Sequence, residues 1–377
     1  MSSLSAKSSL QKNRFLYLDI ARTIAIISIS LNHAVNRTYD NYNDQYAQYL
    51  ELSTLSSILK SVITVFSRIG VPLFLMITGI LILNKKFENE NDLKRFYKHN
   101  WLNIFITTEI WYFIFYWFIV FFNPGNNFLE TLNIKGLSAR CLSTMLFLDQ
   151  TTLGNMWYMP MIICLYLILP FVAFALARFP KKYMAIPISV SFFVCMLLPV
   201  INQYLAFRNI DTIPTIINTA NIPSIYMIYI FVGFCLSKGL LSKVNNWILL
   251  LLLVTTFTTA CWYQYYAYSM PQNYLIAYQS PAMLLCAMLI LELIKRKEGL
   301  FKGLSKVFIY ISKITFGIFF VHIIIMELLK YYFDFSKFPL PLKMAFLEIV
   351  SVGGSIIIIA LLSKVKIFKK YLFMIKD

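Results

Sequence analysis

Charged residues are scarce in this sequence, at 14% of 377 residues, whereas hydrophobic residues make up 59%. Soluble domains carry about 25% charged residues, so this shortage excludes an ordinary soluble protein. Apolar stretches of roughly 18–24 residues recur from Leu16 to Leu362, and each is long enough to cross the ~30 Å hydrocarbon core of a bilayer. The sequence therefore predicts an all-α protein that forms a polytopic transmembrane helical bundle.

Cysteine is also rare, and its placement excludes two further kinds of site. None of the six cysteines is spaced as Cys-x-x-Cys, so we expect neither a disulfide framework nor a bound metal. The sequence lacks the Gly-x-Ser-x-Gly turn that carries a hydrolase nucleophile, so any chemistry is expected within the helices. The first apolar stretch carries Asp19 and Arg22 and is too long for a cleavable signal peptide, so we expect an uncleaved first span.

The apolar stretches predict about ten spans in one membrane domain, residues 14–363. We expect the polar, Ser-rich residues 1–13 to form a disordered cytoplasmic N-terminus, and residues 364–377 to form a basic cytoplasmic tail. The spans are predicted near residues 16–35, 62–83, 101–122, 156–177, 184–202, 222–240, 246–264, 275–294, 307–329 and 344–363.

Positive charge is abundant, with a formal net charge of +17, but its distribution is not that of a nucleic-acid-binding protein. If the N-terminus is inside, most of the 34 lysines and arginines fall in the inner connections and the C-terminal tail. Every inner connection is then more basic than the outer ones beside it, which is the positive-inside pattern for two cytoplasmic termini. We therefore expect the basic residues to face anionic lipid, no nucleic-acid partner, and outward-facing connections at 36–61 and 123–155.

The first predicted span places ionisable residues along one face of a helix. Arg22 and His33 are 11 residues apart, which is about 20° beyond three full turns, and they are separated by roughly 16 Å along the axis. Asp19 lies one turn before Arg22 and can pair with it. Two interpretations stay open: an interfacial ion pair with a polar residue at the helix end, or part of a site inside the membrane.

Because the spans alternate in direction, further polar side chains are expected at the depth of His33. These are Arg68, Trp157, Tyr158, His322 and Glu327. The two aromatic residues are also typical of the belt at a membrane interface, and the glutamate is near enough to the helix end to face water. Together, the ionisable residues indicate a polar cavity in the outer half of the bundle.

Four segments follow one another along the chain. Residues 18–22, ten further residues and His33 form an Arg-x10-His pattern. Residues 71–79 read Val-Pro-Leu-Phe-Leu-Met-Ile-Thr-Gly, residues 155–160 read Asn-Met-Trp-Tyr-Met-Pro, and residues 311–322 end in Gly-Ile-Phe-Phe-Val-His. In this order and spacing they resemble the motifs of the bacterial membrane-bound acyltransferases of the acyltransferase-3 family, which O-acylate carbohydrates.

The resemblance implies an integral membrane O-acyltransferase of the bacterial inner membrane, with residues 14–363 as its acyltransferase-like domain. It implies acyl-coenzyme A, expected to be acetyl-CoA, as donor substrate, no permanently bound cofactor, and a free or lipid-linked carbohydrate acceptor. The donor phosphates require cations, and the candidate donor-binding residues are Arg22 with Asp19, Arg95 and Lys98. At the place of Arg95 and Lys98 the family has the pattern Arg-x-x-Arg. Lys98 thus replaces an arginine, and lysine lacks the bidentate fork of arginine.

The resemblance also implies catalytic roles. His33 is the expected general base, because an alcohol is a poor nucleophile at neutral pH. His322 or Arg68 is expected to stabilise the oxyanion, and Glu327 is expected to orient a histidine. An acetyl-His33 intermediate is equally compatible with these residues.

Trp157 and Tyr158 are the expected acceptor pocket, as aromatic residues that can form hydrogen bonds. A transporter or flippase of lipid-linked sugars is the alternative function, because it would use the same polar residues to bind sugar. The sequence shows no matched pair of Gly- or Pro-broken helices of the kind found in inverted-repeat transporters. A polymerase of lipid-linked polysaccharide is a weaker alternative, since no large catalytic outer loop is present.

Overall fold

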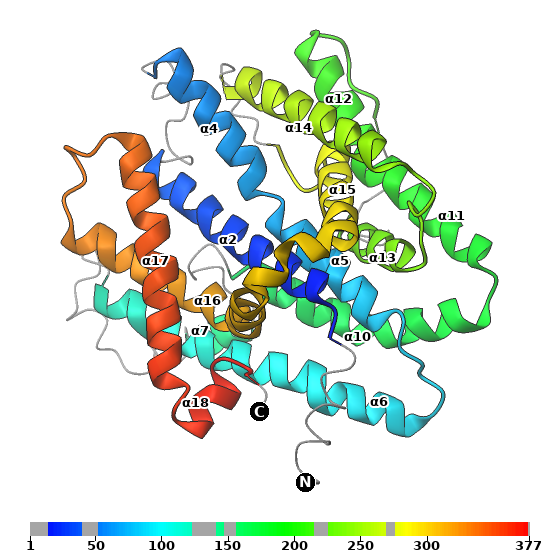
Figure 1. Cartoon of the computed structure of the whole chain (residues 1–377), viewed down its shortest axis with the longest axis horizontal. Coiled ribbons are helices and arrows are strands. Elements are labelled where there is room, and N and C mark those ends of the chain that lie inside the picture. Colours follow the sequence, from blue (N-terminus) through cyan, green and yellow to red (C-terminus); the bar gives the residue numbers. More distant parts are fainter. Residues whose placement is uncertain are drawn as a thin grey trace.

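The structure, a computed structural model, describes residues 14–39, 52–122, 141–146, 156–214, 225–268 and 276–375. Within these ranges the regular elements are helices and no strand is present. Eight helical stretches in this part of the chain are long and apolar enough to cross a membrane. The predicted all-α class and the polytopic transmembrane helical bundle are thereby confirmed (Figure 1).

The elements follow the chain in a simple order. They are α2 (Leu16–Thr38), α4 (Thr54–Ser67), α5 (Gly70–Ile82), α6 (Glu90–Phe96), a π-helical turn (Tyr97–Trp101), α7 (Leu102–Phe122), α10 (Tyr158–Arg178), α11 (Lys181–Phe192), a second π-helical turn (Phe193–Leu197), α12 (Leu198–Phe207), α13 (Ile225–Ser237), α14 (Asn246–Tyr268), α15 (Pro281–Lys297), a 3₁₀ turn (Glu298–Leu304), α16 (Ser305–Tyr332), α17 (Leu340–Leu362) and α18 (Lys366–Tyr371).

Two features account for the difference between eight long stretches and ten predicted spans. One stretch, Pro281–Tyr332, contains both α15 and α16, which are joined by the 3₁₀ turn. The helix α13 has only 13 residues and therefore counts as a short apolar helix. Every predicted span overlaps a described helix, and the number of helices that cross the bilayer stays a prediction.

The two predicted terminal segments differ in what the structure describes. Residues 1–13 lie outside the described residues. In the C-terminal segment, Phe373 is 1% exposed, and its ring centroid lies 6.4 Å from that of Trp111 in α7. Trp111 Nε1 also donates to the carbonyl oxygen of Leu372 at 2.9 Å. The described part of this segment thus packs on the bundle and does not extend as a free tail.

The helix α2 lies in the middle of the bundle, where it packs against α4, α5, α16 and α17 (Figure 1). Its side chains facing these neighbours include Ala21 and Ala25, which are fully buried. A Cβ atom on Gly70 would lie 2.4 Å from the carbonyl oxygen of Ala25, so only glycine lets the start of α5 reach the backbone of α2. Small residues therefore hold α2, the helix with Arg22 and His33, against its neighbours.

The outside of the bundle is apolar. Only 11% of the most apolar part of α14 is buried in the bundle. Its Trp247 is 78% exposed. Water would penalise such a surface, whereas lipid chains cover it without cost. The exposed face of α14 is therefore the kind of surface that faces lipid.

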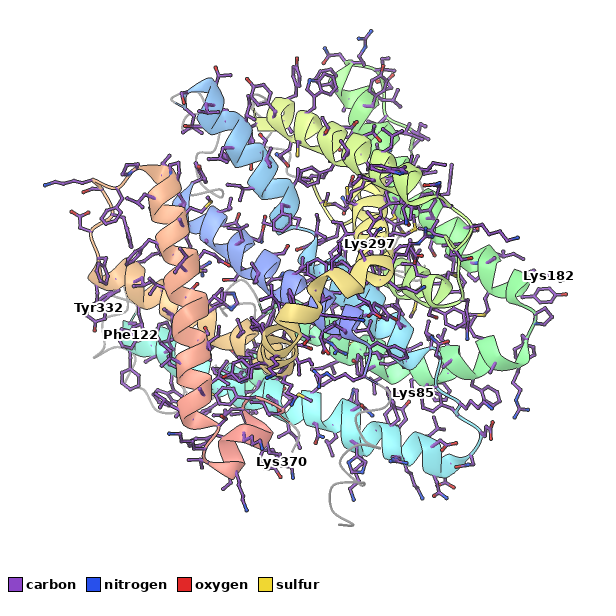
Figure 2. All side chains as sticks on the ribbon, viewed as in Figure 1. Lys85, Phe122, Lys182, Lys297, Tyr332 and Lys370 are labelled. Atoms are coloured by element: carbon purple, nitrogen blue, oxygen red, sulfur yellow. The ribbon has the colours of Figure 1, made fainter. Side chains whose placement is uncertain are left out.

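The two ends of the bundle differ in charge. Figure 2 shows Phe122 and Tyr332, the last residues of α7 and α16, together at one edge, while Lys85, Lys182 and Lys370 lie toward the opposite side. We call the end that holds the three lysines the basic end, and the end that holds Phe122 and Tyr332 the far end. The positive-inside pattern predicts that the basic end faces the cytoplasm.

Candidate active site

Asp19 is the centre of a polar cluster at the basic end of α2, and it is 1% exposed. Arg14 donates to it from Nε at 2.6 Å and from Nη2 at 2.7 Å, and Ser312 Oγ donates to Oδ1 at 2.6 Å. Arg22 Nη1 lies farther away, 3.5 Å from Oδ1. The predicted ion pair of Asp19 with Arg22 is present at this distance, and Arg14 is a further and closer partner, because its bidentate pair is the stronger geometry.

This geometry separates the roles of two predicted donor-binding residues. Both carboxylate oxygens of Asp19 are occupied, so Asp19 positions its neighbours and offers nothing to an anionic donor. Arg22 keeps unused N–H donors, because besides its approach to Asp19 it forms one long hydrogen bond, 3.4 Å from Nη1 to Ser312 Oγ. Its side chain is 26% exposed. Arg22 is thus a reachable cation of the kind that binds phosphate.

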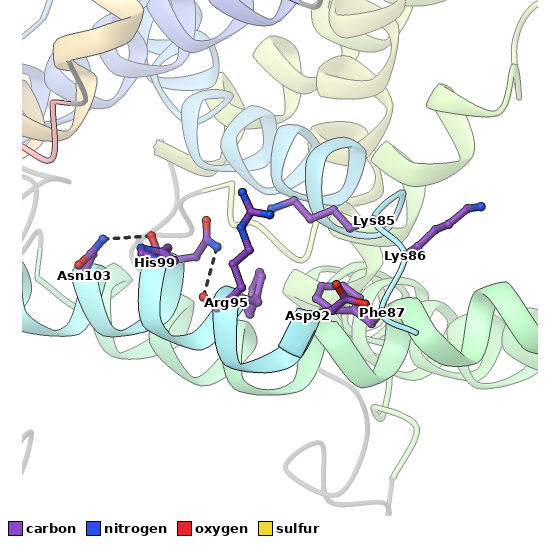
Figure 3. A pocket seen from close by; sticks show the side chains of 9 residues that line it. Lys85, Lys86, Phe87, Asp92, Arg95, His99 and Asn103 are labelled. Atoms are coloured by element: carbon purple, nitrogen blue, oxygen red, sulfur yellow. Dashed lines mark hydrogen bonds between the residues drawn. The ribbon is translucent and has the colours of Figure 1, made fainter. Parts of the chain in front are cut away.

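A second group of cations lines a cavity of about 700 Å³ at the basic end (Figure 3). The lining comes from the loop after α5, from α6 and from the helix that follows it, and consists of Lys85, Lys86, Phe87, Asp92, Arg95, Phe96, His99, Asn100 and Asn103. Figure 3 shows the Arg95 and Lys85 side chains extending toward each other, whereas Lys86 points away. Like charges held together repel, so an anion near them is favoured.

The cavity lining includes Arg95 but not Lys98, whose role in donor binding stays a prediction. An α-helix would place Arg95 and Lys98 on one face, at positions i and i+3. Residues Tyr97–Trp101 instead form a π-helical turn, whose i→i+5 hydrogen bonds widen the helix. Lys98 is therefore exposed outside the cavity, and His99 lies in the lining together with Arg95.

At the far end, α2 and α16 bring the two predicted histidines together. The ring centroids of His33 and His322 lie 5.5 Å apart, with 48° between the ring planes. His322 is fully buried, and its Nδ1 lies 2.6 Å from the carbonyl oxygen of Ile318. Because a carbonyl only accepts, Nδ1 carries the proton, and Nε2 remains as a buried acceptor that has no hydrogen-bond partner among the described residues.

This tautomer argues against the predicted role of His322 as an oxyanion stabiliser, and that role stays a prediction. Neutral imidazole that is protonated on Nδ1 presents a lone pair at Nε2, and a lone pair repels an oxyanion. His322 is instead suited to accept a hydrogen bond or a proton. Within the described part of the chain, no three His, Cys, Asp or Glu side chains are grouped so that they could hold a metal ion.

Arg68 lies at the two-residue break between α4 and α5. The break packs on α2, where Ser28 Oγ lies 2.9 Å from the carbonyl oxygens of both Phe66 and Ser67. Arg68 Nη1 donates to the carbonyl oxygen of Ile276 at 2.8 Å, while Nε is buried and has no hydrogen-bond partner among the described residues. Arg68 thus has a donor to spare, and its role toward the oxyanion stays a prediction.

Glu327 has a different partner from the predicted one. Arg37 donates to its Oε1 from Nε at 2.8 Å and from Nη2 at 2.5 Å. Arg37 Nη1 also lies 3.4 Å from the carbonyl oxygen of His33. The ion pair joins α2 to α16 one turn beyond His33 and five residues beyond His322. This ion pair links the two helices that carry the histidines, and the predicted role of Glu327 in orienting a histidine stays a prediction.

The predicted acceptor residues belong to an aromatic cluster. Trp157 is 41% exposed, and its ring centroid lies 5.7 Å from that of Tyr278. The Tyr158 ring lies 5.7 Å from Phe319, which in turn lies 6.4 Å from His322. Tyr158 is thus connected to the histidine pair through Phe319, and the acceptor role of both residues stays a prediction.

Comparison with known protein families adds an independent observation. A family described as an acyltransferase domain matches residues 15–363, a range that includes every predicted site residue. The chain belongs to the acyltransferase-3 family. It is therefore a membrane-bound acyltransferase, as the sequence motifs indicated. Comparison with curated proteins gave no match, and comparison with solved structures gave none.

In this acyltransferase one pair of helices connects the two ends of the site. On α2, Arg22 lies at the basic end and His33 toward the far end, while α16 carries Ser312 beside the first and His322 beside the second. Ser312 and His322 are ten residues apart, or about 15 Å along the axis. The seam between α2 and α16 thus runs from Arg22 to the histidine pair.

Sequence reasoning overlooked several ionisable side chains of the acyltransferase that are buried or have buried atoms, among them Glu348 and Lys60. Glu348 lies in α17, where its Oε2 accepts a 2.8 Å hydrogen bond from Ser30 Oγ and its Oε1 is buried with no partner in the described residues. Lys60, which the charge pattern assigned to an outer connection, is fully buried in α4. An acid inside an apolar stretch was a sufficient signal for Glu348. No signal existed for Lys60, because its burial depends on where α4 begins.

Proposed function

We propose that this acyltransferase transfers an acetyl group from cytoplasmic acetyl-CoA to a hydroxyl of a cell-envelope polysaccharide, in the bacterial inner membrane. The observation that supports this most is the seam between α2 and α16. Along it, Arg22 and its unused N–H donors lie about 16 Å from the level of the paired His33 and His322. Acetyl-CoA has anionic phosphates at one end and a thioester at the end of a linear arm. Its phosphates can therefore lie at Arg22 while its thioester lies at the level of His33.

At the basic end, the proposal assigns the donor phosphates to Arg22, Arg95, Lys85 and His99. Arginine presents a planar fork of donors that matches phosphate oxygens, and each charge-assisted hydrogen bond contributes about 1.5–3 kcal/mol. The pantetheine arm of the donor then runs between α2 and α16 toward the far end. Asp19 contributes indirectly, because its pair with Arg14 leaves the guanidinium of Arg22 available.

At the far end, the proposal assigns the base to His33. The proposal has Nε2 of His322, which has no hydrogen-bond partner among the described residues, accept the N–H of His33 during the reaction, so that the other nitrogen of His33 carries no proton. That nitrogen takes the proton of the acceptor hydroxyl while the oxygen attacks the thioester carbonyl. The tetrahedral intermediate then expels the thiolate of coenzyme A, which receives the proton from His33, and Arg68 is the candidate cation for the oxyanion. Transfer through acetyl-His33 uses the same residues and stays an alternative.

The acceptor is assigned to the far end, where Trp157 is partly exposed and Tyr158 connects to the histidines. A free or lipid-linked carbohydrate then enters from the side opposite the donor. Membership of an acyltransferase family over residues 15–363 favours this function over a transporter or flippase of lipid-linked sugars.

The experiment uses purified protein in lipid nanodiscs and acetyl-CoA that is labelled in the acetyl group. We expect the wild type to release coenzyme A and to transfer the label to envelope polysaccharide. His33→Ala is expected to lower release by at least about 100-fold, the usual effect of losing a general base, without a lower unfolding temperature. His99→Ala is the matched control, because it removes a histidine from the basic cavity: it should raise the donor concentration required and leave the maximal rate nearly unchanged. A wild type that releases no coenzyme A under any condition contradicts the proposal.

A further inference from the structure

A buried cation lies outside the residues discussed so far as donor or catalytic groups. Lys60 of α4 is 0% exposed, and its Nζ has no hydrogen-bond partner in the described part of the chain. Nζ lies 4.2 Å from the ring centroid of Tyr268 and 4.9 Å from that of Tyr39. The two rings attract the charge of the ammonium, but they do not replace the three hydrogen bonds that it can donate.

The tyrosine whose ring Lys60 faces, and the residue before it in the sequence, also carry buried hydroxyls. The hydroxyls of Tyr39 and of its neighbour Thr38 are buried and have no hydrogen-bond partner among the described residues. Burial raises the pKa of Tyr39, so its hydroxyl keeps its proton. The hydroxyl of Tyr268 is already in a 2.8 Å hydrogen bond with Thr64 Oγ1. Since buried polar groups are nearly always satisfied, three such groups on neighbouring side chains indicate a missing acceptor.

An anion is the acceptor that suits Lys60 best, because it compensates a buried positive charge and accepts hydrogen bonds as well. No ion pair between described residues includes Lys60, and at this end of the bundle Glu327 is held by Arg37. The aromatic rings of Tyr39 and Tyr268 add flat walls to the site, which suit the apolar face of a sugar ring that carries the anionic group.

The position of Lys60 relates this site to the acyltransferase reaction. Tyr39 follows His33 by six residues, about 9 Å along the axis of α2. The helix α4 that carries Lys60 packs on both α2 and α14. An anion bound at Lys60 would thus lie beyond the histidines, on the side away from the cations of the basic end.

We propose that Lys60, Tyr39 and Thr38 bind an anionic group of the acceptor, a carboxylate or a phosphate, and that this acyltransferase therefore acts on an acidic glycan. The identity of the ligand as the acceptor rests on the proposed function. The binding of an anion at Lys60 does not.

The experiment measures thermal unfolding of the full-length protein in detergent, with coenzyme A present throughout to fill the basic end. Sodium D-glucuronate, D-glucose 1-phosphate and neutral D-glucose are compared at equal ionic strength, set with sodium methanesulfonate. We expect at least one of the two anions to raise the unfolding temperature of the wild type by several degrees, and glucose to have no effect. Stabilisation by glucuronate alone identifies a carboxylate-bearing acceptor, and stabilisation by glucose 1-phosphate alone identifies a phosphate-bearing one.

Lys60→Met keeps the length of the side chain and removes the charge. It is expected to be at least as stable as the wild type without ligand, because an unpaired buried charge is lost, and to lose the response to the anions. Lys60→Arg should keep part of the response. Lys337→Met removes an exposed lysine from the connection after α16 and should respond as the wild type does. A wild type that neither anion stabilises, or a Lys60→Met protein that is stabilised equally, overturns the proposal.

Tyr39→Phe provides a second, milder test, because it keeps the ring and removes only the unpartnered hydroxyl. It is expected to weaken anion binding about 3–10-fold, as the loss of one hydrogen bond does. Release of coenzyme A from acetyl-CoA without acceptor is measured alongside. It should be equal in the wild type, in Lys60→Met and in Tyr39→Phe. Anion binding without any coenzyme A release refutes the proposed function alone, whereas release without anion binding refutes this inference alone.

Discussion

The two ends of α2 satisfy their polar groups in opposite ways. At the basic end, Asp19 is buried and receives short hydrogen bonds at both oxygens, and a cavity of about 700 Å³ lies at the same end. At the far end, His322, Glu348 and Lys60 each keep a buried polar atom that has no partner among the described residues.

An unsatisfied buried polar group costs about 1–3 kcal/mol. The basic end is therefore complete before any ligand binds, with its carboxylate neutralised and the donors of Arg22 still available. The far end carries a cost that a bound ligand would remove. The contrast shows that α2 lies in a satisfied polar cluster at its basic end, and beside neighbouring helices with an incomplete hydrogen-bond network at its far end.

The largest expected effect is at the far end. His322→Phe keeps the size of the side chain and removes the acceptor nitrogen, so we expect the maximal rate of coenzyme A release to fall by about 10²–10⁴-fold. The unfolding temperature should not fall, because the substitution also removes Nε2, a buried nitrogen that has no hydrogen-bond partner among the described residues. Rate and thermal unfolding are measured on the same preparation. More than a tenth of the wild-type rate would show that His322 is not part of the reacting group.

At the basic end the expected effect is on donor affinity. Arg22→Ala should raise the dissociation constant of acetyl-CoA by about ten- to a hundredfold, and Arg22→Lys should recover only part of this loss. Asp19→Asn should instead lower the unfolding temperature, because it leaves Arg14 without its buried partner. Binding and unfolding are measured for all three variants. An Arg22→Ala protein that is unstable but binds donor normally would exclude the phosphate contact.

The ion pair between Arg37 and Glu327 tests whether helix spacing matters at the far end. Its side chains are 13% and 27% exposed. Either Arg37→Met or Glu327→Met leaves one charge unpaired, and we expect the rate to fall by roughly 5–30-fold as the helices that carry the histidines shift. The double variant should regain part of the rate. Strictly additive losses in this double-mutant cycle would mean that the two residues act independently.

The smallest expected effect separates two neighbours on one turn. Arg95→Ala should weaken acetyl-CoA binding about 3–10-fold, and more strongly at low salt, because the cavity is open to water. Lys98→Ala should change binding by less than about twofold, since Lys98 lies outside the cavity lining. Titrations of acetyl-CoA at two salt concentrations measure both. Equal effects of the two substitutions would contradict the inference that the π-helical turn places Lys98 outside the donor-binding cavity.

The positions of the site residues along their helices could be predicted from the sequence, whereas most of their contacts with other helices could not. Sequence spacing placed Arg22 and His33 at two levels of one helix face, because both belong to one regular element. It also placed His322 at the level of His33, and the two rings are neighbours, whereas Glu327 is connected to His33 only through Arg37. It did not predict their contacts: the proton on Nδ1 of His322 depends on the carbonyl of Ile318, and the partner of Glu327 depends on the packing of α16 against α2.

The sequence by itself determined the class and most of the span positions of this acyltransferase. Bilayer thickness sets the length of an apolar helix, and the helical repeat sets which residues share its face, so both can be counted along one segment. Only the tertiary structure decided which charges are paired. Partners such as Arg14 and Ser312 for Asp19, or none for Lys60, depend on how separate helices pack and on a π-helical turn that shifts the register after Arg95. Those contacts depend on close packing between segments distant in sequence, which no spacing within a single segment records.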